Sequence, residues 1–201
     1  MKSLLLLLAL AAPGTLVVAC RATPAEKPQE VEPELRRVHR KDGATGRVVH
    51  SWSVLVYPDG HSERHGKEER WYANGARLSL AEFDHGQQVG VFSRWYENGQ
   101  RQAESSFDPD GQITPMTFWH PNGKVSGRGS ARRGVREGYW NFWFRDGLPR
   151  ERGGYAEGAR SGLWTLYHEG GGIAAEGRFE SGERVGPWQH FDVGERPEQP
   201  R

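Results

Sequence analysis

The sequence repeats with a period of 24 residues, and this period limits the chain to a small set of folds. Glycines, aromatic residues and turn dipeptides all recur at this interval in one phase. The glycines are Gly66, Gly90, Gly138, Gly162 and Gly186, with Thr114 as the exception. The aromatic residues are Trp71, Trp95, Trp119, Trp143, Tyr167 and Phe191. Such a period is typical of repeat proteins, in which each unit buries its apolar surface against the next.

Each unit reads as two short strands joined by a tight turn. The turns are Asn74-Gly75, Asn98-Gly99, Asn122-Gly123 and Asp146-Gly147, and we expect type I′ turns with positive φ at both residues. A second glycine series marks the reversal into the next unit: Gly86, Gly111, Gly134, Gly158 and Gly182. No window has a helical apolar stripe. The sequence therefore predicts an all-β fold, an elongated single-layer antiparallel sheet of repeated 24-residue β-hairpins over residues 46–193.

The six aromatic residues from Trp71 to Phe191 are predicted to form a structural ladder along the sheet. Phe83, Phe107, Tyr155 and Phe179 come from the intervening strands, where they would fill the gaps between the rungs. Strict alternation puts Trp140 and Phe142 on one face and Trp143 on the other. Either both faces carry aromatic side chains, or a bulge re-aims part of the strand.

The N-terminus is typical of an exported lipoprotein. Lys2 precedes the apolar run from Leu4 to Leu10, and "VVAC" then ends in Cys20, the only cysteine. The run is too short to span a membrane, and it predicts a signal peptide over residues 1–20. Val17 to Cys20 resemble a bacterial lipobox, which implies acylation of Cys20 and a membrane anchor. Arg21 is not the aspartate that retains such proteins in the inner membrane, so the resemblance implies the outer membrane.

Proline and charged residues dominate residues 21–45, and we expect a disordered tether there, with a second disordered tail at 194–201. Removal of Lys2 with the leader leaves 26 basic and 26 acidic side chains. A neutral chain of this kind argues against a nucleic-acid partner.

Two clusters qualify as candidate sites. His61, Glu63 and His65 share one face of a strand, but exposed polar residues explain this spacing as well, so no metal site is predicted. Four arginines between two units form a candidate anion-binding patch: Arg128, Arg132, Arg133 and Arg136. The same stretch lacks the usual glycine at Thr114, and we expect an irregular region between Asp108 and Gly134.

The unit G-x-W-x-x-[WY]-[YFH]-x-[ND]-G resembles MORN repeats, in particular the variant of bacterial proteins, some of which carry antitoxin labels. The resemblance covers Gly66 to Val193, and "GYWNFWFRDG" (Gly138 to Gly147) is one of its best matches. It implies a twisted single-layer sheet, no catalytic residue and a role in protein contacts or, in some eukaryotic members, phospholipid binding.

We therefore expect a non-enzymatic envelope lipoprotein without a cofactor, whose repeats are a scaffold for another envelope protein. Two alternatives stay open: a module that binds lipid or glycan at the membrane surface, and a periplasmic immunity-type partner of a toxin. Buried tryptophans would favour the scaffold, whereas a flat row of exposed rings would favour a ligand-binding module.

Overall fold

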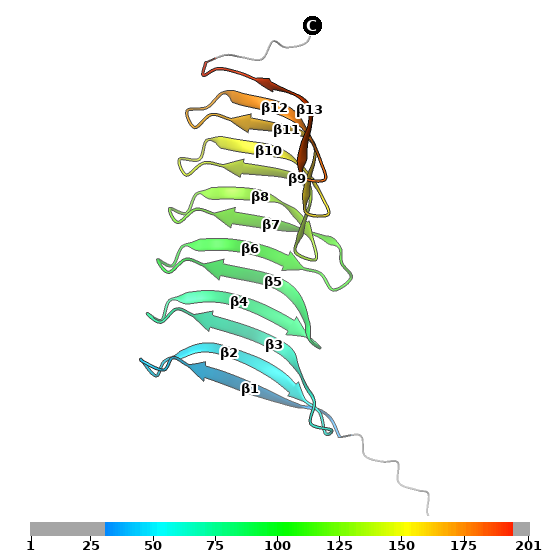
Figure 1. The fold of residues 1–201 in the computed structure, drawn as a ribbon. Helices are drawn as coiled ribbons and strands as arrows, with labels where there is room; N and C mark the ends of the chain where they lie inside the picture. Colours follow the sequence, from blue (N-terminus) through cyan, green and yellow to red (C-terminus); the bar gives the residue numbers. More distant parts are fainter. Residues whose placement is uncertain (1–30, 195–201) are drawn as a thin grey trace, which may run out of the picture. The chain divides into compact units, whose positions relative to one another are not determined.

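The structure, a computed structural model, describes residues 31–194, and these form one open antiparallel sheet. Thirteen strands follow one another in chain order, as Figure 1 shows from β1 in blue to β13 in red. The described residues contain no helix, and hence none able to cross a bilayer. The predicted all-β meander is confirmed.

The strands are seven to ten residues long. Their bounds are β1 Glu34–Lys41, β2 Val48–Val56, β3 Ser62–Trp71, β4 Arg77–Asp84, β5 Gln87–Trp95, β6 Arg101–Phe107, β7 Ile113–Trp119, β8 Val125–Arg132, β9 Val135–Trp143, β10 Pro149–Ala156, β11 Ala159–Tyr167, β12 Ile173–Glu180 and β13 Glu183–His190.

The turn types differ from the prediction, because the type I′ geometry occurs at the other set of turns. At Asn74-Gly75 only the glycine has positive φ, and Gly75 N–H donates to the Tyr72 carbonyl at 2.9 Å. This is a type I turn followed by a left-handed glycine, so the predicted type I′ geometry is wrong there. The second glycine series adopts it instead. In the pairs His85-Gly86, Arg133-Gly134, Glu157-Gly158 and Ser181-Gly182 both residues have positive φ.

The first glycine series bends the strands. Gly138 has a φ of 70°, and residues 138–140 of β9 lie opposite the single residue Gly129 of β8. The same irregularity occurs around Gly90 and Gly186, where three residues again oppose one. Bulges of this kind increase the twist of the sheet and curve the bulged strand. The long strands of this single layer therefore bend across one face of the sheet.

One face of the sheet carries the aromatic core, and we call it the core face. Its buried cluster is Trp140, Phe142, Tyr155, Trp164 and Phe179, with Met116, Phe118 and Trp188 packed against it. Each indole covers a glycine of the preceding strand. The pairs are Gly129 with Trp140, Gly153 with Trp164 and Gly177 with Trp188.

The predicted ladder is not this core. Trp71, Trp95, Trp119, Trp143 and Tyr167 are only half-buried, Phe191 alone is buried, and none belongs to the core cluster. The register pairs Trp140 with Gly153 and Gly138 with Tyr155, so Tyr155 shares a face with Trp140 and not with Trp143. The two aromatic series therefore lie on opposite faces. The expectation that one interleaves with the other is wrong, and both faces carry aromatic side chains.

The ladder residues instead serve as backbone acceptors between units. In four units the side chain that follows the rung reaches the main-chain carbonyl of the next rung. Tyr72 Oη donates to the Trp95 carbonyl at 2.9 Å, and Tyr96 Oη donates to the Trp119 carbonyl at 2.8 Å. His120 and His168 repeat the contact with the carbonyls of Trp143 and Phe191 at 2.9 and 3.0 Å. These bonds tie each hairpin to the next.

The sheet begins earlier than predicted. Strand β1, Glu34–Lys41, lies inside the segment expected to be a disordered tether, residues 21–45, and it pairs with β2 along its whole length. Its side chains are nearly all exposed, so no apolar alternation reveals it. Backbone pairing and Arg37 hold it, since Arg37 donates to Ser51 Oγ at 2.8 Å and to Glu69 Oε2 at 2.7 Å.

The irregular stretch is confirmed at one position, the seam between β6 and β7. Only three residue pairs join these strands, whereas five join β4 and β5, the corresponding strands one unit earlier. Residues 108–112 form a longer connection than the two-residue turns that join β4 to β5, β8 to β9, β10 to β11 and β12 to β13. Strand β7 itself pairs regularly with β8 through Thr114 and Pro115.

Candidate functional site: an arginine-rimmed groove

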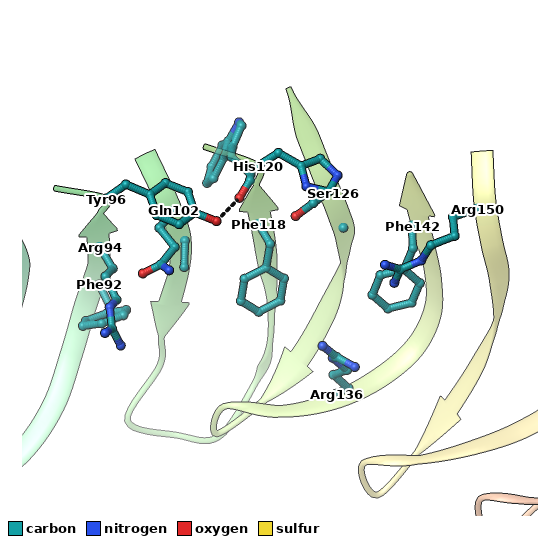
Figure 2. A pocket seen from close by; sticks show the side chains of 13 residues that line it. Phe92, Arg94, Tyr96, Gln102, Phe118, His120, Ser126, Arg136, Phe142 and Arg150 are labelled. Carbon is teal, nitrogen blue, oxygen red and sulfur yellow. Dashed lines mark hydrogen bonds between the residues drawn. The ribbon is translucent and has the colours of Figure 1, made fainter. Parts of the chain in front are cut away.

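A groove of about 570 Å³ crosses the core face from β5 to β10 (Figure 2). It lies at the end of the aromatic core. In the last three units one repeat position holds Trp140, Trp164 and Trp188. In the two units before them the same position holds Phe92 and Met116. Smaller side chains there leave the surface hollow, beside the seam where β6 and β7 pair least.

The floor of the groove is apolar. Phe92, Phe118 and Phe142 stand on β5, β7 and β9, with Ala103 and Gly127 between them. A Cβ on Gly127 would lie 2.9 Å from the Phe142 ring, so the glycine keeps this part of the floor open. Stacked repeats thus place one ring every second strand, with small residues on the strands between.

Three guanidinium groups surround the floor. The Arg136 guanidinium lies over four rings, at 4.9 Å from Trp140, 5.2 Å from Phe142 and Tyr155, and 5.8 Å from Phe118. Arg150 lies 5.4 Å from the Phe142 ring and pairs with Glu151 at 3.1 Å. Arg94 is exposed and forms no ion pair with any described residue.

A bulge in each unit turns one further side chain toward the groove. Arg150 has no partner in β9, because Pro149 pairs with Trp143 and Glu151 with Phe142. Gln102 is the corresponding residue of β6. Its Oε1 is buried and accepts no hydrogen bond from the described residues. A buried acceptor without a donor costs about 1–3 kcal/mol.

None of the thirteen lining residues is acidic. Tyr96 and His120, which also line the groove, are already engaged with the carbonyls of Trp119 and Trp143. The groove therefore offers an apolar floor and positive charge. These groups suit a ligand with carboxylates and apolar side chains.

Comparison with protein-family models finds one match within this region. Residues 88–108 match the MORN repeat variant. They include Phe92, Arg94 and Gln102 of the groove. Comparison with curated proteins finds no match to the chain.

The MORN-like units do not bring the four predicted arginines together. Arg136 belongs to the core face and Arg128 is exposed on the opposite face, because Arg128 pairs with Asn141 and Gly127 with the buried Phe142. Arg132 donates to the Gly111 carbonyl at 3.1 Å. Arg133 occupies the β8–β9 turn with a φ of 50°. The prediction of a single four-arginine patch is wrong, since the side chains divide between two faces and a turn.

The "HSERH" cluster is also divided, since His61 lies before β3 while Glu63 and His65 belong to it. His61 Nδ1 pairs with Asp59 Oδ1 at 2.5 Å, and Glu63 accepts a hydrogen bond from Tyr57. His65 contacts Asp84 and His85 instead. Cys20 and the predicted signal peptide, as well as residues 195–201, lie outside the described residues.

Sequence reasoning missed the arginines that stack on the core aromatics. They form a further series at the 24-residue period, in which two positions hold glutamine: Arg64, Gln88, Gln112, Arg136, Arg160 and Arg184. Arg160 lies 4.3 Å from the Trp164 ring and Arg184 lies 4.1 Å from the Trp188 ring. The two glutamines interrupt the series beside the groove. This signal is present in the sequence, and counting charged residues at the period would have found it.

Proposed function

We propose that this chain is a non-enzymatic scaffold of the bacterial cell envelope, anchored by a lipid on Cys20, and that the groove receives an acidic segment of a partner protein. The proposal rests on the described lining of the groove, which holds three arginines and no acidic residue, with Glu151 paired to Arg150 beside it. The MORN-like units supply the scaffold, because repeated hairpins display one long face. The core tryptophans Trp140 and Trp164 are fully buried, which favours a scaffold over a row of exposed stacking rings.

The dimensions of the groove favour an extended peptide. Six strands spaced about 4.8 Å apart give a span of about 24 Å, and an extended chain rises about 3.3 Å per residue. About seven residues therefore cross the groove. Apolar side chains of the segment would rest on Phe92, Phe118 and Phe142, while its carboxylates would meet Arg94 and Arg150.

The energetics assign different roles to the two kinds of contact. Exposed ion pairs contribute about 0–1 kcal/mol each, so the arginines mainly select an acidic segment and speed its association. Burial of apolar surface contributes about 25 cal/mol per Å², so the phenylalanine floor supplies most of the affinity.

A labelled synthetic decapeptide that alternates glutamate with phenylalanine is a direct probe of the groove. Fluorescence anisotropy should show binding that weakens at least tenfold in Arg94→Glu, because a repulsive charge replaces an attractive one. Arg128→Glu is the matched control, since Arg128 is equally exposed but lies on the opposite face. Equal losses in both variants would mean that net charge and not the groove governs binding.

The anchor is tested separately in cells. Export through the "VVAC" signal and acylation of Cys20 should place the wild-type chain in the membrane fraction, and in the outer membrane because Arg21 follows the cysteine. Several acyl chains are needed for stable anchoring, and a lipoprotein cysteine supplies them. Cys20→Ser should move the chain to the soluble periplasmic fraction. A serine variant that stays with the membrane would refute the lipid anchor.

A further inference from the structure

A cluster of metal-ligating side chains lies on the β3–β4 hairpin, away from the groove. His65 of β3, Asp84 at the end of β4 and His85 of the following turn each direct one ligand atom to a common region, and these atoms all lie within 4.8 Å of one another. Asp84 Oδ1 is 3.3 Å from His65 Nδ1 and 2.8 Å from His85 Nδ1. The two imidazole rings meet edge to face at 5.0 Å.

The turn geometry brings these residues together. His85 and Gly86 form a two-residue turn, and Gly86 N–H donates to the Arg64 carbonyl at 2.8 Å. This bond holds the turn against β3 beside His65. The cluster therefore joins a strand to a turn 20 residues further along the chain, as the weak 3.5 Å contact from His85 N–H to His65 Nδ1 also shows.

The spacing fits a tetrahedral metal ion. Zinc bonds to histidine nitrogen and carboxylate oxygen measure about 2.0–2.2 Å, so neighbouring ligand atoms lie about 3.3–3.5 Å apart around the ion. The His65–Asp84 separation of 3.3 Å already matches, and the shorter His85–Asp84 separation opens by side-chain rotation. Two imidazoles and one carboxylate suit zinc, and similar first-row ions such as cobalt.

We propose that His65, Asp84 and His85 bind one zinc ion, with the fourth position open to water or to a ligand from a partner. Glu63, two residues before His65 on β3, adds negative charge nearby, since its Oε2 lies 3.8 Å from the Cβ position of Gly86. Bound zinc would clip the β4–β5 turn to β3. This site is independent of the groove and of the proposed partner.

Isothermal titration of the full chain with zinc chloride tests the site. Cys20 is first changed to serine in every sample, because an unacylated thiolate also binds zinc. We expect one equivalent per chain, and at least tenfold weaker binding in both His65→Ala and His85→Ala. His61→Ala is the matched control, because His61 is an exposed histidine of the same strand region that pairs with Asp59 outside the cluster.

Cobalt gives a second readout that does not depend on affinity. Cobalt added to the same chain should give the visible absorption of a tetrahedral complex, and His85→Ala should abolish it while circular dichroism confirms that the sheet is intact. Zinc binding that is equal in wild type and His85→Ala, or that falls equally in His61→Ala, would overturn the proposed site.

Discussion

The indole of Trp164 occupies the space in which a side chain of Gly153 would lie. A Cβ on this glycine would be 2.3 Å from Trp164 Cδ2, and Trp164 Nε1 donates to the Gly154 carbonyl at 3.1 Å. Trp140 has the same arrangement over Gly129 and bonds the Ser130 carbonyl at 2.9 Å. In earlier units the large residue is smaller and its partner is larger, with Phe92 opposite Ala81 and Met116 paired with Ser105. The large and the small residue of each pair thus change together.

Gly153→Ala should destabilise the sheet, because the added methyl group displaces a fully buried indole. Overpacking of this kind costs about 1–3 kcal/mol in the free energy of unfolding. Chemical denaturation measures the change. The control is Gly170→Ala, at a turn glycine with nothing within 4 Å of its Cβ position and no positive φ. It should change stability by less than about 0.5 kcal/mol. Equal effects would mean that the Trp164 contact has no special weight.

Phe144→Tyr should stabilise the protein. Phe144 occupies the place of Tyr72, Tyr96, His120 and His168 in its unit but has no group to donate to the next rung, Tyr167. A tyrosine hydroxyl there would complete the series, at a gain of about 0.5–1.5 kcal/mol. Thermal unfolding monitors the gain, and Tyr96→Phe should lose a similar amount. A Tyr variant no more stable than wild type would contradict this role.

Stability should fall as the pH drops below the ordinary histidine range, and His50 contributes to the fall. Burial, together with the charges of Arg70 and Arg40, lowers the pKa of His50 against the opposing hydrogen bond and charge of Glu68, whose carboxylate also pairs with Arg70 at 2.8 Å. Because the folded pKa lies below the unfolded value of about 6.5, the unfolded chain binds the proton first. Below that pH the proton therefore favours unfolding, and above it His50 has no effect.

Denaturation at pH 7 and pH 5 measures this dependence, which for one proton has a slope of at most about 1.4 kcal/mol per pH unit. His50→Gln should flatten the profile. His39→Gln, at an exposed histidine of β1, is the control and should leave the profile as in wild type. A profile unchanged by His50→Gln would show that other groups produce the acid sensitivity.

Hydrogen exchange should find the weakest seam of the sheet at Ser106. The carbonyl of Ser106 accepts the Thr114 hydroxyl at 2.5 Å, so its peptide group faces β7, yet Ser106 has no pairing partner there. Glu82, at the same place one unit earlier, pairs with Val89. The Ser106 amide should exchange at least tenfold faster than that of Glu82, because open seams exchange through low-energy local opening. Equal exchange rates at the two amides would contradict a weak seam between β6 and β7.

The period predicted the strands, their order and the reversal between units, because glycines and aromatic residues mark every hairpin. It did not predict which aromatic residues are buried. Leu78, Gln102, Ser126, Arg150 and Ala174 each lack a partner on the preceding strand, and the bulge at each of them shifts the alternation of side chains. Strict alternation counted across such a bulge assigns the wrong face.

The groove was not predictable from one unit, because it depends on differences between units. Met116 in place of tryptophan and the shortened β6–β7 pairing create it, and its arginines come from two different repeat positions and a bulge. Strand β1 was missed for another reason: its pairing is a property of the backbone, and its exposed side chains resemble those of a tether.

The bonds from Tyr72 and Tyr96 to the next rung end on main-chain carbonyls, which every residue possesses. For this bond a unit thus brings its own donor and requires no particular side chain from its neighbour. Units whose core aromatic and small residues match those of their neighbours can therefore be duplicated, lost or exchanged in a gene, each step altering the sheet by about 9.6 Å. The length of the sheet can therefore evolve in steps of equal size.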